Sequence, residues 1–407
     1  MKRLAVLAGF ALVLCAEGSA ASSRPVFAIV GKKISTQQLV RVDAGTLRPL
    51  GQGLLLAGQR YGRSFSADGR LLALGSGDMR CGKLRTTLRI ADVLQMKTVG
   101  QFEIADSGPV QASAWLARNR LAAVVGPGRC GSATQTRAVV VDPVTGRVVA
   151  RTWIRGNVIA SGRAPGALVL LLEPPQGLGS ARVVVVSADG RVRQKVLEGV
   201  PAGTPRYPFR TPVSTPGLAV DGTAMHAFVV TGADRMGVTE VDLRTMRVAY
   251  HRLTERTLAK GVTGSQRQAV WLGGGLLAVT GIDTFPPGVV PAGLRVVDTR
   301  AWRSRTIDRD VSHIDLAGNL ILAEGGSYSV VDGSSFTGLI AFSRSGRERY
   351  RIFDGLPVSH AAVIAGRGYA TVGGTTYKNR TIEFDLVSGK VGRSLDQPLW
   401  ELVLPTG

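Results

Sequence analysis

The stretch "VVVDPVTGRVVA" (residues 139–150) contains a sequence motif that recurs along the chain. A run of valines ends at Asp142, a Pro-Val-Thr-Gly turn follows, and a second apolar run begins after Gly146. An Asp at the end of a strand can accept hydrogen bonds from nearby backbone N–H groups, and a glycine completes the tight turn at low steric cost. The stretch therefore predicts two antiparallel strands joined by a short turn.

Seven further segments contain the same motif, with Asp or Ser as the marker residue at the start of the turn. They span residues 39–51, 88–100, 184–197, 239–250, 294–307, 340–353 and 382–395. The markers are Asp43, Asp92, Asp142, Ser187, Asp242, Asp298, Ser343 and Asp385, and successive markers are 42 to 56 residues apart. That period is typical of the four-stranded blades of a β-propeller.

Each copy of the motif forms the third and fourth strands of a blade. Paired apolar runs such as "QAVWLGGGLLAVTG" (268–281) and "AAVIAGRGYATVGG" (361–374) supply the first and second. We therefore predict an all-β, eight-bladed β-propeller of four-stranded blades. Seven blades are the alternative, if the interval 187–242 or 242–298 does not hold a complete blade.

The two ends of the sequence each hold part of a blade. "RPVFAIVGKK" (24–33) has the pattern of a second strand without a first, and "PLWELVLPTG" (398–407) has the pattern of a first strand without a second. We expect the C-terminal strand to pair with the N-terminal blade, which closes the ring and leaves no open sheet edge.

Three segments carry a resemblance to a known superfamily: "SADGRLLALGSG" (66–77), "VVVDPVTGRVV" (139–149) and "IEFDLVSGKVG" (382–392). With them, the chain resembles the YVTN-type, quinoprotein-like (WD-repeat-like) β-propellers over about residues 25–407. The resemblance concerns architecture alone. Eight-bladed quinoprotein alcohol dehydrogenases place a Trp soon after the Thr-Gly turn of each blade, whereas this chain has Arg or Lys, then Val, after Gly146 and Gly389, which argues against a quinone enzyme.

The first twenty residues have the pattern of a signal peptide. Lys2 and Arg3 precede an apolar stretch from Leu4 to Ala16, and Gly18 and Ala20 supply small residues for cleavage. Thirteen apolar residues are too few to span a bilayer comfortably, so we expect no stable membrane insertion. The prediction is a secreted or extracytoplasmic protein, with a signal peptide at 1–20 and a single propeller domain at 21–407.

The formal net charge of +21 favours anionic partners. Arginines are scattered singly instead of in blocks, and no DNA-reading helix is recognisable, so we expect no nucleic-acid binding. Anionic polymers of the cell envelope fit an exported basic protein better.

Cys81 and Cys130 remain after removal of the signal peptide, and each lies in an "RCG" tripeptide. They precede Asp92 and Asp142 by 11 and 12 residues, which places them in matching loops of adjacent blades. An even pair in an exported protein predicts a disulfide that joins the two loops. Two independent thiols are the alternative.

No catalytic or metal-binding signature occurs in the sequence. His226, His251, His313 and His360 are scattered, and none of them has a partner at ligand spacing, so we expect isolated histidines and no metal site. Trp115, Trp271 and Trp400 occupy similar places in first strands, where packing between blades is the favoured interpretation over a ring of ligand-binding aromatics. No cofactor and no catalytic residue is predicted.

The candidate ligand-binding residues are Arg206, Tyr207, Phe209 and Arg210, in the Pro-rich segment 200–216. Mixed cationic and aromatic side chains suit carboxylates, phosphates or sugars, although such a segment can also simply pack its aromatic rings on the rim. In a propeller this segment shares one face with the second-to-third-strand loops, predicted at 75–87, 281–293 and 373–380.

Two functional hypotheses follow. The first is a monomeric binding or scaffolding module that contacts a protein, a glycan or an anionic envelope polymer through the long-loop face. The alternative is an extracytoplasmic propeller enzyme of lactonase, lyase or sugar dehydrogenase type, with its site in the central funnel.

Overall fold

A computed structural model describes residues 26–31, 37–56, 61–76, 85–105, 108–126, 135–175, 177–203, 213–232, 236–253, 262–285, 288–373, 379–395 and 402–403. All regular elements in these ranges are β-strands, as the sequence predicts. Within the same ranges, no helix is long and apolar enough to cross a membrane.

Most strands belong to four-stranded antiparallel sheets. From one edge to the other, these sheets are β34 (Leu402–Val403), β1 (Val26–Val30), β2 (Gln38–Val42) and β3 (Pro49–Leu55); β4 (Tyr61–Phe65), β5 (Leu71–Ser76), β6 (Thr86–Asp92) and β7 (Lys97–Ala105); β8 (Val110–Ala117), β9 (Arg120–Val125), β10 (Gln135–Val141) and β11 (Val148–Arg155); β12 (Asn157–Ala164), β13 (Ala167–Glu173), β14 (Gly179–Ser187) and β15 (Val192–Ala202); β17 (Gly217–Asp221), β18 (His226–Thr231), β19 (Gly237–Asp242) and β20 (Val248–Arg252); and β30 (Val358–Ile364), β31 (Arg367–Val372), β32 (Arg380–Phe384) and β33 (Val391–Leu395).

The remaining strands form one ten-stranded sheet. They are β16 (Val213–Thr215), β21 (Gly264–Gly273), β22 (Leu276–Phe285), β23 (Gly288–Pro291), β24 (Leu294–Asp298), β25 (Arg303–Asp308), β26 (His313–Ala317), β27 (Leu320–Ser329), β28 (Gly333–Ser343) and β29 (Glu348–Ile352). Strands β21–β22–β24–β25 and β26–β27–β28–β29 repeat the four-stranded pattern, and β23 joins them by pairing with both β22 and β27.

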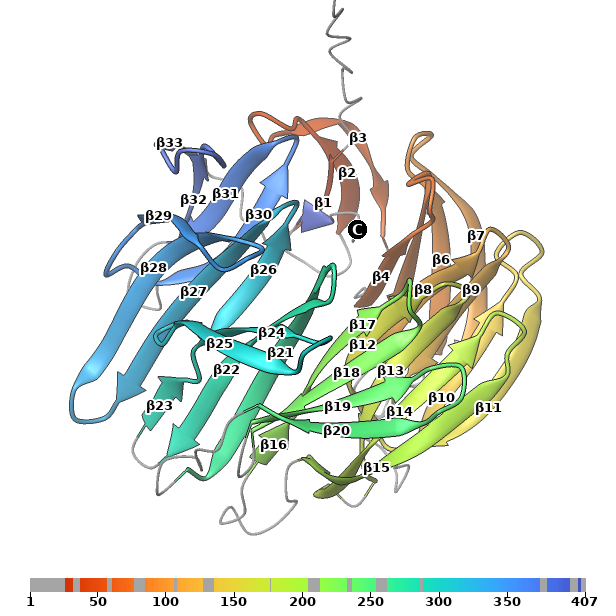
Figure 1. Cartoon of the computed structure of the whole chain (residues 1–407). Coiled ribbons are helices and arrows are strands. Elements are labelled where there is room, and N and C mark those ends of the chain that lie inside the picture. Colours follow the sequence, from red (N-terminus) through yellow and green to blue (C-terminus); the bar gives the residue numbers. More distant parts are fainter. Residues whose placement is uncertain are drawn as a thin grey trace, which may run out of the picture.

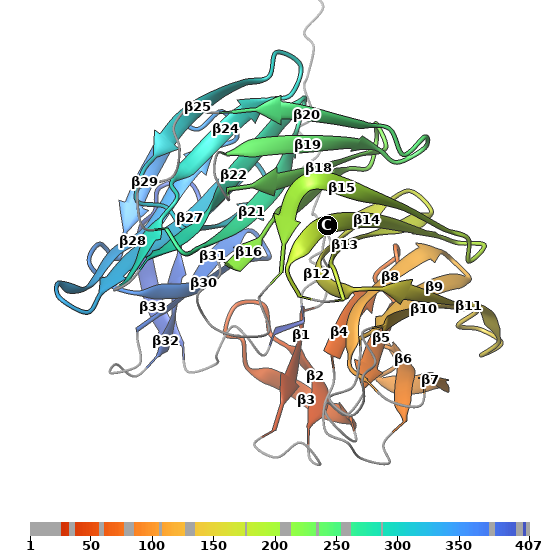
Figure 2. The same cartoon turned by 90° about the horizontal axis from the view of Figure 1, so that it is seen from below.

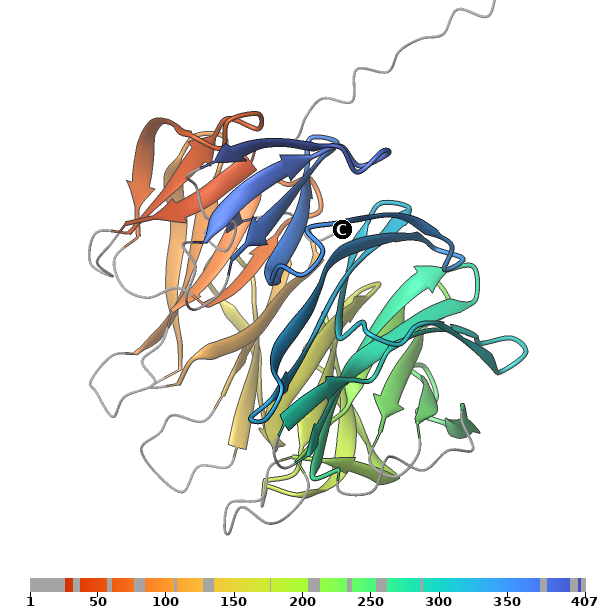
Figure 3. The same ribbon diagram turned by 90° about the vertical axis from the view of Figure 1, so that its left-hand side faces the viewer.

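The sheets follow one another around the molecule in chain order (Figure 1). The last sheet, β30–β33 in blue, lies beside the red strands β1–β3, and the side view in Figure 3 shows the same neighbourhood. Seen from below in Figure 2, β16 lies between β15 and β21. Residues at the two ends of the described chain are therefore neighbours in space.

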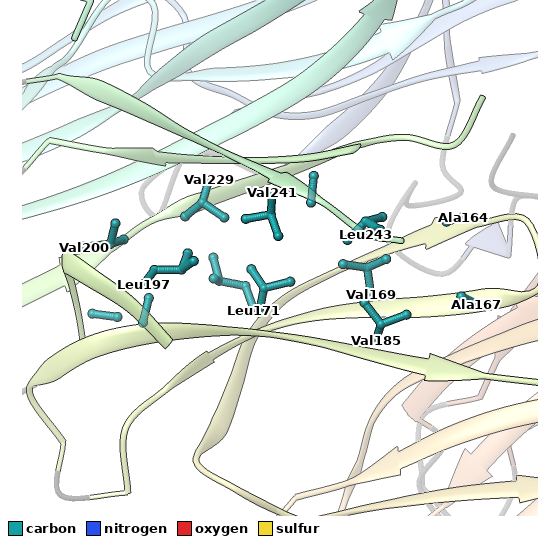
Figure 4. Packing of buried hydrophobic residues seen from close by; sticks show 14 residues of the cluster. Ala164, Ala167, Val169, Leu171, Val185, Leu197, Val200, Val229, Val241 and Leu243 are labelled. Carbon is teal, nitrogen blue, oxygen red and sulfur yellow. The ribbon is translucent and has the colours of Figure 1, made fainter. Parts of the chain in front are cut away.

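Each pair of neighbouring sheets encloses an apolar cluster. Strand β13 shows why its sequence, "ALVLLLE", lacks polar alternation. Its odd-numbered residues, such as Val169 and Leu171, pack against the β17–β20 sheet, as Figure 4 shows. Its even-numbered residues, such as Leu168 and Leu170, pack against the β8–β11 sheet. Since both faces of the strand are buried, both sets of side chains must be apolar.

The first and last sheets also pack against each other. Val26 and Ala28 of β1 share one cluster with Ile364 and Tyr369 of the β30–β33 sheet. The Tyr369 hydroxyl donates a hydrogen bond to the Ala44 backbone oxygen, 2.9 Å away. Strand β34 adds a two-residue antiparallel ladder to β1.

The predicted turn chemistry is confirmed at the marker Asp residues. Asp142 Oδ1 accepts hydrogen bonds from the backbone N–H groups of Val144 (2.9 Å) and Thr145 (3.2 Å). Asp43, Asp92, Asp242, Asp298 and Asp385 make the same pair of bonds. Gly146, four residues after Asp142, has a φ of 70°, in the left-handed region that glycine adopts without strain.

Other turns place a larger residue at this left-handed position. Leu47, Met96, Met246 and Trp302 have φ angles of 54°, 49°, 59° and 52°. The conformation costs an L-residue about 1–2 kcal/mol. The side chains offset this cost by packing: Leu47 is fully buried, and the Trp302 ring stacks on His251.

The ends of the sheets differ in their connections. We call the end with the turns between first and second and between third and fourth strands the turn face. The opposite end, with the connections between second and third strands and between successive sheets, is the loop face. On the loop face, the loop predicted at 281–293 is wrong for most of its length. Strand β22 continues to Phe285 and pairs with β23, so hydrogen bonding between strands satisfies most of this backbone.

Candidate functional site

A large cavity opens on the turn face of the described structure. It has a volume of about 1100 Å³ and runs across the turns after β4, β6, β8, β10 and β12, and we call it the turn-face groove. Its lining residues are Phe65, Ser66, Ala67, Asp68, Gly69, Arg70, Leu71, Ile90, Asp92, Val99, Trp115, Leu116, Ala117, Arg118, Pro143, Val144, Arg163, Ala164, Pro165 and Gly166. Three successive sheets contribute to it.

Trp115 joins the three sheets beneath the groove. Its side chain is 4% exposed and packs between the β4–β7 and β8–β11 sheets. The indole Nε1 donates to the backbone oxygen of Ser64 on β4 (3.0 Å), and Arg163 of β12 donates to the backbone oxygen of Trp115 (2.8 Å). The floor of the groove is thus held by contacts between first strands.

Arg70 and Asp92 form an ion pair in the wall of the groove. Arg70 Nε lies 2.9 Å from Asp92 Oδ2, and the Asp92 side chain is only 3% exposed. Burial by itself raises the pKa of Asp92, but hydrogen bonds from the Gln95 backbone and from Arg70 outweigh it and hold that pKa below its ordinary value. Asp92 is therefore ionised near neutral pH, and Arg70 compensates its charge.

Asp68 is satisfied by its own turn. Its Oδ1 accepts hydrogen bonds from the Ser66 hydroxyl (2.5 Å) and from the Arg70 backbone N–H (3.1 Å). The bond from Ser66 is the main reason that the pKa of Asp68 is lowered.

Two further cations on the groove lack a carboxylate partner. Arg118 lies in the turn between β8 and β9, and Arg163 lies at the end of β12, and both are exposed. Among the described residues, neither one has a carboxylate within ion-pair distance. A surplus of positive charge therefore remains on the groove.

Apolar side chains stand beside these cations. Val99 of β7 is 47% exposed, and Val144 in the turn after β10 is 79% exposed. A groove that combines unpaired guanidinium groups with exposed apolar surface can bind a ligand that has an anionic group and an apolar body.

Several residues singled out in the sequence lie outside the described residues. They are the candidate ligand-binding residues Arg206, Tyr207, Phe209 and Arg210, the predicted disulfide partners Cys81 and Cys130, and Trp400. The signal peptide predicted at 1–20 lies outside as well. The roles assigned to these residues from the sequence remain predictions.

The predicted packing role is confirmed for two tryptophans. Trp115 is buried between sheets, and Trp271 on β21 stacks on Phe228 of the neighbouring sheet, with ring centroids 5.1 Å apart. The expectation of isolated histidines is wrong for His226 and His251. Adjacent strands carry both to the carboxylate of Glu240, at 2.5 and 3.3 Å.

Sequence reasoning missed the groove, although a signal for it exists. Arg70, Arg118 and Arg163 lie in or beside the turn between the first and second strands of three successive sheets. The repeated motif, which covers the third and fourth strands, does not include this turn. Short turns were passed over because long loops more often carry binding residues.

Comparison with solved structures identifies the fold. Dihydro-heme d1 dehydrogenase NirN, solved in complex with DHE, aligns with a TM-score of 0.61 and 12% identity over 93% of this chain and 74% of that chain. The chain is a β-propeller. At this identity the likeness shows the fold alone.

Two further propellers align with this one at a TM-score of 0.44 and 12% identity each. One is the Cps50 (Swd1) propeller domain of Myceliophteria thermophila, with 84% of this chain and 88% of that chain covered. The other is the propeller domain of the Trilobed protease of Pyrococcus furiosus, with 81% and 93% covered. No protein-family model matches the sequence, and no curated protein matches it.

Proposed function

We propose that this propeller is an exported binding module and that the turn-face groove takes an anionic ligand with an apolar part. The observation that carries the proposal is the pair Arg118 and Arg163, exposed on the groove without carboxylate partners among the described residues. The net charge of +21 favours the approach of such a ligand from a distance. Anionic polymers and glycans of the cell envelope belong to this class.

The architecture proposed with this function is a ring of eight blades. The four-stranded sheets, together with the two four-stranded groups within the ten-stranded sheet, support this count. Packing of Val26 and Ala28 against Tyr369 supports closure between the first and last blades. An experimental structure with seven sheets around the axis would overturn it.

The long-loop face remains part of the proposal as a second contact surface, since Arg206 and Arg210 combine charge with neighbouring aromatic residues in sequence. The described turn-face groove is the surface for which an experiment can be designed residue by residue.

The test uses 8-anilinonaphthalene-1-sulfonate, an aromatic anion whose fluorescence reports binding. We expect the double variant Arg118→Gln/Arg163→Gln to bind the probe at least about tenfold more weakly, because two charge-assisted contacts are lost. Affinity for the unaltered protein should fall as salt concentration rises.

Arg349→Gln is the matched control, because Arg349 is an exposed arginine on β29, away from the groove. It should leave probe binding unchanged. Equal affinity of the unaltered protein and the double variant would remove the groove from the proposal.

A further inference from the structure

A second, smaller cavity lies on the loop face, on the other side of the molecule from the turn-face groove. Its volume is about 240 Å³, the space of roughly eight water molecules at about 30 Å³ each. It lies where β23, the β27–β28 hairpin and the start of β30 meet, so residues of two neighbouring sheets line it. The lining residues are Val289, Ser312, Glu324, Gly325, Gly326, Ser327, Tyr328, Ser334, Phe336 and Val358. We call it the Glu324 cavity.

Glu324 is the one charged residue in the described lining. Its Oε2 atom is buried and accepts no hydrogen bond from the described residues. No Lys or Arg is among the described residues that line the cavity, although these residues total 50 in the chain. A buried carboxylate oxygen without a hydrogen-bond donor is costly, so the site favours a ligand that supplies positive charge.

Two aromatic residues also line the cavity, and one of them, Tyr328, is 51% exposed. Tyr328 of β27 and Phe336 of β28 line the cavity together with Glu324, and Ser334 adds a hydroxyl group. Aromatic faces attract organic cations through their quadrupole, and this attraction strengthens when a carboxylate neutralises the charge nearby. A metal ion fits less well, because hard cations require six or more oxygen ligands and one carboxylate lines this cavity.

The neighbouring charged groups come from β26. His313 pairs in register with Glu324, and its Nε2 lies 3.5 Å from Asp315 Oδ2. Strands β28 and β30 contribute Ser334, Phe336 and Val358, which carry no charge near neutral pH. The electrostatics of the cavity are therefore set by Glu324, His313 and Asp315.

We propose that the Glu324 cavity binds a small organic cation of the methylated-amine class, with the Glu324 carboxylate as counter-ion and Tyr328 and Phe336 as its aromatic wall. This site lies beyond the function proposed for the turn-face groove and does not depend on it, since the two cavities share none of their described lining residues.

Binding by this site depends on pH. Burial raises the pKa of Glu324 to about 7, and the charge of His313 opposes this rise. The hydrogen bond to Asp315 raises the pKa of His313 above its ordinary value. Ionisation of Glu324 makes the cavity more negative as pH rises. Affinity for a cation should therefore increase from pH 5.5 to pH 8, by up to about tenfold per unit below the pKa of Glu324.

The experiment is a calorimetric titration of the full chain with choline and with 3,3-dimethylbutan-1-ol, its uncharged carbon isostere. We expect choline to bind with an affinity that rises with pH, and the isostere to bind at least about tenfold more weakly, because only choline offers the charge. The Glu324→Gln substitution keeps the shape of the side chain. It should lower the affinity for choline to that for the isostere.

Phe336→Leu should lower the affinity for choline severalfold and leave the pH dependence of that affinity unchanged. Glu348→Gln is the control for loss of one negative charge, since Glu348 lies on the outer strand β29, and it should change nothing. His313→Gln tests which group controls the pH dependence of binding: that dependence should persist in this variant and vanish in Glu324→Gln.

Three outcomes would overturn the proposal: no choline binding at pH 8, equal binding of the isostere, or full binding by Glu324→Gln. Probe binding at the turn-face groove, measured on the same Glu324→Gln protein, should remain normal. Failure of this site is therefore distinguishable from failure of the proposed function.

Discussion

The turn-face groove and the Glu324 cavity lie on opposite faces of the propeller and on different sheets, and they differ in size and charge. On the turn face, the short first turns of three successive sheets place Arg70, Arg118 and Arg163 in the lining of one groove. On the loop face, β23 pairs with both β22 and β27, and the cavity beside β27 and β28 contains the Glu324 carboxyl group. Sheets of one repeated type can thus form a cationic groove on one face and a small acidic cavity on the other.

The largest effect is expected for the floor of the turn-face groove. Trp115→Ala should lower the free energy of unfolding by about 3–5 kcal/mol, because it leaves a cavity between sheets and removes the hydrogen bond to Ser64. Phe336→Ala, at the wall of the half-buried Glu324 cavity, should cost only about 1–2 kcal/mol. Denaturant unfolding measures both, and similar losses would mean that the two cavities do not differ in this way.

The next effect concerns pH and the loop face. The pKa of Glu324 is raised in the folded protein, to about 7 from an ordinary 4.5, so its contribution to stability is complete below pH 4.5 and is lost as pH rises through 7. The loss amounts to at most about 3 kcal/mol. Unfolding of the Glu324→Gln variant should lack this part of the pH dependence, whereas Arg118→Gln on the turn face should retain it. A pH profile unchanged by Glu324→Gln would contradict the burial of this carboxyl group.

The smallest effect concerns the turns themselves. Gly146→Ala should destabilise the protein by about 1–2 kcal/mol, because φ at this residue is 70° and an added Cβ would meet the Phe102 ring at 2.9 Å. Gly166, in the turn between β12 and β13, has a φ of 68° and open space around it. Gly166→Ala is thus the control for backbone strain without steric contact, and it should cost about 1 kcal/mol. Thermal unfolding that ranks the two variants in reverse would show that contact with Phe102 does not matter.

Local sequence was sufficient to predict the strands and their turns. The motif around Asp142 specifies its own hydrogen bonds, since donor and acceptor lie within a few residues of each other. Burial of both faces of β13 follows from its unbroken apolar run. The left-handed residues Met96 and Trp302 could not be predicted, because their backbone strain is offset by packing against distant residues.

The candidate sites were much harder to predict. Sequence reasoning chose segment 200–216 and the long loops, whereas the described cavities involve short turns and two paired hairpins. It also treated the histidines as isolated, although His226 and His251 are 25 residues apart and bind one carboxylate. No spacing rule reports such a contact, because it depends on the register of three strands.

Repetition along the chain was enough to predict an all-β propeller of four-stranded sheets, because the period, the turn residues and the apolar runs each reflect interactions within one hairpin. The placement of Arg118 and Arg163 on one groove, and the burial of the Glu324 Oε2 atom, depend on how neighbouring sheets pack. The residues involved are far apart in sequence. Both features arise from packing between sheets, a property of the assembled molecule that no single repeat contains.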